Sequence, residues 1–190
     1  MILASSSPRR KEILAMAQLD FDVIPSECDE HISADSPEEY VSRLSRRKCA
    51  DVAAKAGAGH IVIGADTIVV FEGRIMGKPE DGADAYRMLR ALSGNTHTVY
   101  TGVSIMDTEN GREFTFYEQT DVTMYDVSDE AIRLYIETGD PLDKAGAYGI
   151  QGRGAFLVEK INGDFYTVMG FPVARFLKEL NNRFRYALPA

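Results

Sequence analysis

Apolar residues recur along this chain with two periods, one typical of strands and one typical of helices. Short runs rich in β-branched residues predict strands, and apolar positions three and four residues apart predict amphipathic helices. The predicted strands span residues 1–4, 21–24, 61–63, 68–70, 96–106, 114–127, 156–161 and 165–169. The predicted helices span residues 8–18, 36–56, 81–92, 128–137 and 172–185. No internal repeat, linker or low-complexity segment interrupts them, and the length suits one domain or two closely joined lobes.

One carboxylate, Asp66, lies between two of these apolar runs, at 61–63 and 68–70, which we expect to form a pair of strands. A charge among buried residues is costly unless it is paired, solvated or bound to a metal. Gly64 and Ala65 carry little side chain, so another group can approach the backbone closely there. Asp66 is therefore either a residue at a strand end that caps a turn, or a functional carboxylate.

The first predicted helix begins with an unusual charge pattern. Ser7 is a natural N-cap and Pro8 a natural first helical residue, but Arg9, Arg10 and Lys11 follow at once. Three cations in a first turn oppose the helix dipole, which favours negative charge there. Free N–H groups, serine hydroxyls and guanidinium groups together would hold a phosphate well. The sequence favours an anion site here over a solvated basic turn.

The predicted helix at 36–56 carries a lysine in its apolar stripe. Ser36 and Glu39 form a capping box at its start. Lys48 lies in the middle of a stripe with four-residue spacing, whose other members are Tyr40, Leu44, Val52 and Ala56. Such a lysine either extends its ammonium group to solvent or points into a polar pocket, and a lysine that faces a phosphate is competitive here.

Three loops carry further polar or glycine-rich patterns. The acidic loop 27–31 is a weak zinc candidate, because no partner pair has suitable spacing. A single carboxylate that helps to hold a hard divalent ion is more plausible than zinc, but the local sequence by itself favours a solvated acidic loop. The glycine-punctuated turn 73–79 contains Lys78. The glycine-rich segment 139–154 lets backbone approach a ligand, but its spacing fits neither a Walker A loop nor a dinucleotide fingerprint. Asn110-Gly111 predicts a hairpin.

Composition narrows the class of protein. The chain has 190 residues, 45% hydrophobic and 26% charged, as in an ordinary globular protein. Its net charge of −8 argues against a nucleic-acid binder. Two cysteines without CxxC spacing fit a reducing compartment. With no signal-peptide core and no membrane-length apolar run, we expect a soluble cytoplasmic protein that does not bind membranes.

Several of these segments together resemble the Maf family of nucleoside triphosphate pyrophosphatases. They occur in the family's order, and the first and last are long and specific. The matching segments are Leu3–Arg10, Gly64–Thr67, Gly77–Pro79, His97–Gly102 and Asp143–Gly152. The resemblance covers nearly the whole chain and implies a single domain over 1–190. It implies a mixed α/β fold like that of inosine triphosphate pyrophosphatases, with a long sheet flanked by helices and a deep cleft, in a homodimer.

The resemblance also implies an activity, which is hydrolysis of a nucleoside triphosphate to the monophosphate and pyrophosphate, aided by Mg²⁺ or Mn²⁺. Asp66 falls on the family's general base. The other active-site positions are Ser5, Arg9, Arg10, Glu30, Lys48 and Lys78, with Asp66 and Glu30 as the carboxylates for the metal. Arg10, Thr67 and Gln151 fall on positions tied to substrate choice. The glutamine at position 151 resembles the residue found there in the branch of the family that prefers dTTP and UTP.

Three alternatives stay open at this point. Asp66 would either take the proton from the attacking water or hold the metal that acidifies it. The substrates would be ordinary or modified pyrimidine nucleotides. A protein that binds nucleotides to regulate cell division and septum formation, without significant turnover, is the rival function. Such a regulator would need the phosphate site but neither Asp66 nor the metal.

Overall fold

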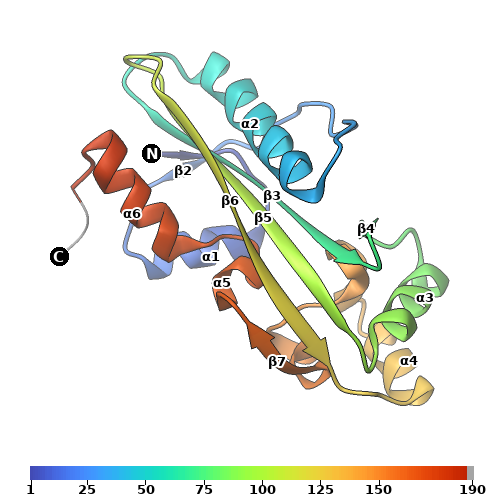
Figure 1. The fold of residues 1–190 in the computed structure, drawn as a ribbon. Coiled ribbons are helices and arrows are strands. Elements are labelled where there is room, and N and C mark those ends of the chain that lie inside the picture. The colour runs from blue at the N-terminus through green and yellow to red at the C-terminus, as the bar shows by residue number, and fades with distance from the viewer. Residues whose placement is uncertain (188–190) are drawn as a thin grey trace. The chain divides into compact units, whose positions relative to one another are not determined.

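The computed structural model describes residues 1–187, and the described part of the chain contains both strands and helices (Figure 1). The strands are β1 (Ile2–Leu3), β2 (Asp22–Val23), β3 (Ile61–Phe71), β4 (Arg74–Met76), β5 (Thr96–Asp107), β6 (Glu113–Met124) and β7 (Val158–Asn162). The helices are α1 (Pro8–Met16), α2 (Pro37–Ala56), α3 (Gly82–Leu92), α4 (Asp129–Glu137), α5 (Phe165–Met169) and α6 (Val173–Phe184). None of the helices in this range combines the length and apolar character needed to cross a membrane.

The strands form one mixed sheet of seven strands, in the order β2-β1-β3-β5-β6-β7 with β4 also paired to β3. β1 runs parallel to both β2 and β3, and Ile2 lies opposite Asp22 on one side and Val62 on the other. β4 is antiparallel to β3, and β7 is antiparallel to β6. The expected mixed α/β fold with a long sheet is confirmed; the expected cleft stays a prediction.

Contacts divide the chain into two compact units. The first unit comprises residues 1–66, 101–118 and those from Gly170 on, and the second comprises residues 67–100 and 119–169. The long strands β3, β5 and β6 each contribute residues to both units. The prediction of a single domain over residues 1–190 stays a prediction.

In the first unit, helix α2 lies directly against the backbone of β3 and β5. A Cβ atom on Gly64 would lie 2.3 Å from the carbonyl oxygen of Ser45, and one on Gly102 would lie 2.3 Å from that of Val41. The buried hydroxyl groups of Ser45 and Ser104 form a hydrogen bond of 3.0 Å between α2 and β5. The two glycines therefore set how closely α2 approaches the sheet, because any side chain there would overlap with helix backbone.

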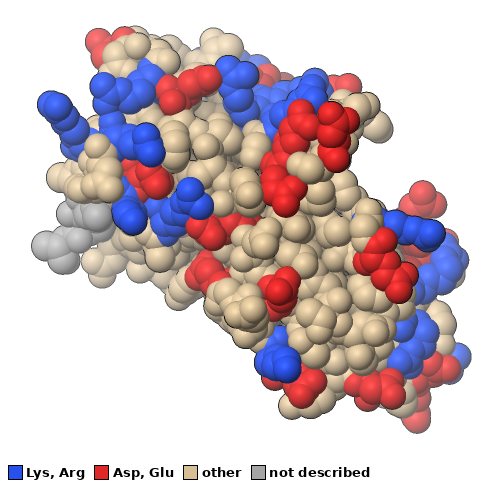
Figure 2. All heavy atoms as spheres, in the orientation of Figure 1, with Lys and Arg blue, Asp and Glu red and all other residues tan. Residues whose placement is uncertain are grey.

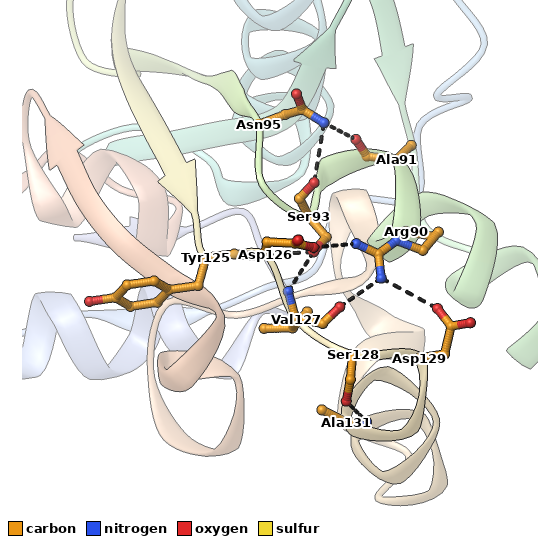
Figure 3. Close-up of polar contacts among 10 residues, drawn as sticks. All are labelled: Arg90, Ala91, Ser93, Asn95, Tyr125, Asp126, Val127, Ser128, Asp129 and Ala131. Carbon is orange, nitrogen blue, oxygen red and sulfur yellow. Dashed lines mark hydrogen bonds and ion pairs between the residues drawn. The ribbon is translucent and has the colours of Figure 1, made fainter.

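In the second unit, α3 and α4 pack with the glycine-rich segment around an apolar core that includes Leu89 and Ile132. Arg90, near the end of α3, connects α3 to the segment before α4 (Figure 3). Its guanidinium pairs with Asp126 at 2.9 Å and Asp129 at 3.3 Å and donates to the carbonyl of Val127 at 2.6 Å. A single arginine thus fixes the connection between β6 and α4.

The predicted pair of strands around Asp66 is wrong, since β3 continues without a break from Ile61 to Phe71. Side chains alternate along a strand, so Val62, Gly64 and Asp66 share one face. That face is the one covered by α2, since Gly64 meets the helix backbone and Asp66 bonds to Lys48 of α2. Asp66 therefore lies inside a strand under a helix and does not cap a turn.

The predicted strand at 165–169 is also wrong, because this segment is the short helix α5. The carboxylate of Asp164 accepts hydrogen bonds from the backbone N–H and the hydroxyl of Thr167, at 2.7 and 2.8 Å. An aspartate that bonds to an N–H three residues later is an N-cap, and this interaction outweighs the β-propensity of the apolar residues that follow.

The helix caps match the sequence at α2 but not at α1. Ser36 accepts from the N–H of Glu39 at 3.2 Å, so the capping box is confirmed at its first bond. Ser7 occupies the N-cap of α1 but makes no capping bond through its side chain. Its own N–H instead donates to the hydroxyl of Ser5 at 3.2 Å.

Within the turn predicted at 73–79, residues Arg74–Met76 form the short strand β4.

Candidate active site

Three charged side chains meet in the first unit. The ammonium group of Lys48 lies 2.9 Å from a carboxylate oxygen of Asp66 and 3.0 Å from one of Glu30. The residues come from helix α2, strand β3 and the loop between β2 and α2. Lys48 and Asp66 are buried, with 9% and 7% of their surface exposed, whereas Glu30 is exposed. The Lys48 ammonium group thus forms ion pairs with two carboxylates, one buried and one exposed to solvent.

The sequence left open whether the Lys48 side chain extends to solvent or points into a polar pocket, and the surroundings of Lys48 decide between the two. It does not extend to solvent, because Asp66 on the neighbouring strand provides a buried partner. Removing a lysine and an aspartate from water costs free energy, which is offset only when the two charges pair closely. The close approach of α2 at Gly64 makes that pairing possible.

Glu30 is positioned by residues of α2 that the sequence analysis did not single out. The guanidinium of Arg47 donates to the carbonyl of Asp29 at 2.7 Å and to that of His31 at 3.2 Å, which are the residues on either side of Glu30. Asp51, one turn later, accepts from the backbone N–H of Glu27 at 2.9 Å. The only sequence signal for Arg47 was its position beside Lys48, since an acceptor in a distant loop leaves no pattern.

The predicted anion-binding turn lies in the same unit. Arg10 donates from Nε to the carbonyl of Gly170 at 2.9 Å and from Nη1 to the hydroxyl of Ser5 at 3.2 Å. Burial lowers the pKa of the Arg10 guanidinium; the charges of Asp66 and Glu30 oppose this shift, and the charge of Arg9 adds to it. The Arg10 side chain is thus held by a backbone carbonyl and a hydroxyl group of its own unit.

The backbone around Arg10 also matches the predicted phosphate site. Helix α1 has no acidic residue in its first turn, so its N–H dipoles are not neutralised by a carboxylate of the helix itself. The charges of Asp66 and Glu30 also affect Tyr40, at the start of α2. Burial raises the pKa of the Tyr40 hydroxyl, and these two charges raise it further. Neither Tyr40 nor Gly170 was predicted as part of the site.

The remaining predicted site residues, Thr67, Lys78 and Gln151, belong to the second unit. Thr67 is half-buried and follows Asp66 on β3, and Lys78 is exposed in the loop after β4. The carbonyl of Gly77 accepts from the N–H of Gly146 at 3.0 Å, which joins the loop of Lys78 to the glycine-rich segment. Gln151 is half-buried in that same segment, just before a 3₁₀ turn.

The donor set of the first unit fits a hard divalent cation in part. The described residues contain no group of three or more His, Cys, Asp or Glu side chains arranged to hold a metal. Asp66 and Glu30, however, both direct an oxygen at the position of the Lys48 ammonium. Proteins commonly bind Mg²⁺ through one or two carboxylates, with substrate phosphates as the other ligands. These two carboxylates match that mode.

Acidic and basic side chains are interspersed on the face drawn in Figure 2, although the chain has a net charge of −8. Over this face neither sign gathers into one continuous field.

Comparison with known proteins gives the following matches. A family model described as "Maf-like protein" matches residues 1–183. A "dTTP/UTP pyrophosphatase" of Bacillus cytotoxicus is 52% identical over 94% of this chain and 93% of its own length. A Bacillus cereus protein of the same name is 49% identical over 95% of this chain and 93% of its own. A solved structure of a "Nucleoside-triphosphatase / dITP/XTP pyrophosphatase" from Mycobacterium abscessus aligns with a TM-score of 0.45 at 10% identity, covering 97% of this chain and 94% of that one.

Proposed function

This chain belongs to the Maf family, and from that premise we propose that it hydrolyses dTTP and UTP to the nucleoside monophosphate and pyrophosphate. The observation that carries the proposal is the buried Asp66 carboxylate, paired with the ammonium group of Lys48 at 2.9 Å. The names of the two Bacillus relatives support the choice of substrate.

The proposed reaction is attack of water on the α-phosphorus while pyrophosphate leaves. Such catalysis depends mainly on positioning and on positive charge around the phosphate oxygens. Arg9, Arg10, Lys48 and Lys78 supply this charge, with the α1 N-terminus and the Ser5 hydroxyl as neutral donors. Asp66 accepts the proton of the attacking water, and the hydrogen bond from the neighbouring Lys48 orients its carboxylate.

Asp66 and Glu30 are the residues that would hold a divalent cation, Mg²⁺ or Mn²⁺. A bound cation neutralises phosphate charge and acidifies water. Lys48 bonds to both of these carboxylates, so it would hold them in position for a cation and present its ammonium group to a substrate phosphate. Lys48 would then contact both substrate and carboxylate.

Recognition of the substrate base is assigned to Gln151, in the glycine-rich segment. Uracil and thymine present an N–H donor flanked by carbonyl acceptors, and a carboxamide can accept from the first and donate to the second. We assign this recognition to Gln151, with Thr67 and Arg10 as further determinants of substrate choice. The proposal also includes a homodimer and a cytoplasmic location, with no nucleic-acid polymer as partner.

The test is a panel of nucleoside triphosphates assayed for pyrophosphate release, with Mg²⁺ or Mn²⁺ and with a chelator. We expect release from UTP and dTTP that the chelator abolishes. Orthophosphate as the product would contradict attack at the α-phosphorus, and full activity in chelator would contradict the role of the metal.

Asp66→Asn is the matched variant for this assay, because it keeps the size of the side chain and removes its charge and basicity. We expect kcat to fall by about 10²–10⁴, the usual contribution of a general base, while nucleotide binding measured by calorimetry persists. Tight nucleotide binding without turnover in the unmodified protein would instead support the regulator of cell division and septum formation.

A further inference from the structure

The residues around Gln151 form a loop whose two ends touch. A Cβ atom on Gly154 would lie only 2.4 Å from the carbonyl oxygen of Gly149, so the backbone at the two positions is in direct contact. Gln151 lies between them with extended backbone, at φ −107° and ψ 167°. We call residues 149–154 the Gln151 loop, and the contact between Gly149 and Gly154 its neck.

The hydroxyl group of Tyr135, from helix α4, lies at this neck. It accepts a hydrogen bond from the N–H of Gly149 at 3.3 Å and donates one to Asp140 at 2.9 Å. It is also 2.6 Å from where a Cβ atom on Gly154 would be. Tyr135 is 3% exposed, and the ring of Phe156 packs against it edge-to-face at a centroid distance of 6.0 Å. The hydroxyl therefore touches both ends of the loop from a fixed position.

A charged pair behind Tyr135 orients its hydroxyl. The ammonium of Lys144 lies 3.0 Å from Asp140 and 2.8 Å from Asp143, and the side chain of Lys144 is only 11% exposed. Asp140 accepts from the tyrosine hydroxyl, so the hydroxyl proton points toward Asp140. That leaves the lone pairs of the hydroxyl for the N–H of Gly149, and the chain of bonds runs from Lys144 to the neck.

We propose that Tyr135 is a positioning residue for base recognition: its hydroxyl closes the neck of the Gln151 loop and thereby fixes the direction of the Gln151 carboxamide. The inference rests on the proposed function, in which Gln151 reads uracil or thymine. A recognition group is effective only when the surrounding residues hold it within a fraction of an ångström, and on this loop Tyr135 does so from a rigid helix.

The experiment compares Tyr135→Phe with Tyr86→Phe in the full chain. Tyr86 is the matched control, because its hydroxyl bonds to Asp129 in the same unit. The substrates are UTP, CTP and ribose 5-triphosphate, which has no base. For Tyr135→Phe we expect KM for UTP to rise about tenfold, the effect of one lost hydrogen bond, with kcat for UTP and all constants for ribose 5-triphosphate unchanged. The preference for UTP over CTP should fall, and Tyr86→Phe should leave it unaltered.

Hydrogen exchange at the Gln151 loop provides a readout that does not need turnover. Tyr135→Phe should speed exchange of the Gly149 amide, and Tyr86→Phe should not. Gly154→Ala would place a Cβ atom against both the Gly149 carbonyl and the Tyr135 hydroxyl and force the neck apart, so it should lower the same UTP preference. Equal losses on all three substrates together with a lower Tm would assign Tyr135 a merely structural role and overturn the inference.

The outcome separates the inference from the function on which it rests. Unmodified protein that fails to release pyrophosphate from UTP contradicts the proposed function. A second outcome is that the unmodified protein hydrolyses UTP, while Tyr135→Phe keeps the same base preference and the same exchange rate at Gly149. That outcome contradicts only the role of Tyr135 and leaves the proposed function in place.

Discussion

Arg10 shows how a residue's environment changes the prediction made from its position in a helix. The dipole of α1 alone argues that Arg10→Ala costs no stability in the absence of ligand. The structure adds hydrogen bonds from Arg10 to Gly170 and Ser5, which both belong to the same unit. Each such bond contributes about 1 kcal/mol, which exceeds the dipole effect of a few tenths. The structure thus reverses the sign expected from the dipole.

We predict that Arg10→Ala raises KM for UTP by about tenfold to a hundredfold, the loss of hydrogen bonds to a charged phosphate. It should also lower the free energy of unfolding without ligand by about 1 kcal/mol. Lys11→Ala is the control, since Lys11 is an exposed cation in the same turn. Steady-state kinetics and urea unfolding measure both effects. An unchanged KM would make Arg10 a structural residue.

His97 is a buried residue whose protonation couples folding to pH. It is 2% exposed, its Nε2 lies 2.7 Å from the hydroxyl of Tyr148, and its Nδ1 is buried without a hydrogen-bond partner among the described residues. Burial lowers the pKa of His97 from 6.5 to about 4, opposed by the charge of Asp121. The unfolded chain therefore takes up a proton near pH 6.5, whereas the folded protein stays neutral down to about pH 4.

The sign of the pH effect follows from this lowered pKa. The stabilisation is complete above pH 6.5 and is lost as the pH falls toward 4, by up to about 1.4 kcal/mol per pH unit. We predict that His97→Gln, which can still bond to Tyr148, has a flatter dependence of unfolding free energy on pH over this range. Urea unfolding at several pH values measures it. Parallel curves for the two proteins would show that His97 does not contribute.

At the scale of elements, the contact of α2 with the sheet brings Lys48 to Asp66. Gly64 and Gly102 are required there because Cβ atoms would lie 2.3 Å from helix carbonyl oxygens. Neither glycine has a positive φ, so the constraint is space and not backbone conformation. The family motifs that contain these glycines thus also fix the position of a helix.

We predict that Gly64→Ala lowers the free energy of unfolding by about 1–3 kcal/mol, the range for overpacking a core. It should also lower kcat, because α2 must move away from β3 and take Lys48 with it. Gly77→Ala is the control for stability, since Gly77 has nothing within 4 Å of a Cβ and no positive φ. Chemical unfolding and kinetics of the two variants decide this, and equal stability of Gly64→Ala and the unmodified protein would contradict it.

At the scale of the whole molecule, each unit is built from segments far apart in the sequence. The first unit takes residues from both ends of the chain and from its middle, and the second takes residues 67–100 and 119–169. The chain passes from one unit to the other within the strands β3, β5 and β6, so neither unit is a continuous segment of the sequence. This organisation favours cooperative folding of the whole chain.

We predict a single two-state thermal transition in calorimetry, as for one domain. Two destabilised variants sharpen the test: Gly64→Ala in the first unit, and Ala85→Gly in α3 of the second, which costs about 1 kcal/mol in a helix interior. Both should shift the same transition to lower temperature. Two transitions, each moved by only one of the variants, would contradict the prediction of a single domain over residues 1–190.

Features that depend only on neighbouring residues in the chain could be predicted from residue types. The capping pair Ser36 and Glu39, and Pro8 at the start of α1, act within one helical turn, so their residue types suffice. The same holds for the turn at Gly111, whose positive φ of 72° the Asn-Gly pair predicts. Long motifs such as residues 143–152 identified the family, because they combine many positions.

The tertiary structure alone decided what depends on distant contacts. Lys48 could face solvent or core until Asp66 was placed under α2, because the cost of burying its charge depends on the partner. Residues 165–169 have the apolar pattern of a strand but form a helix, because the Asp164 carboxylate caps them. The loop that carries Glu30 is held by Arg47, and the backbone of Gly149, two residues before Gln151, bonds to the hydroxyl of Tyr135. The partners in these contacts are far apart in the sequence and are brought together only by the fold, so no local sequence pattern predicts them.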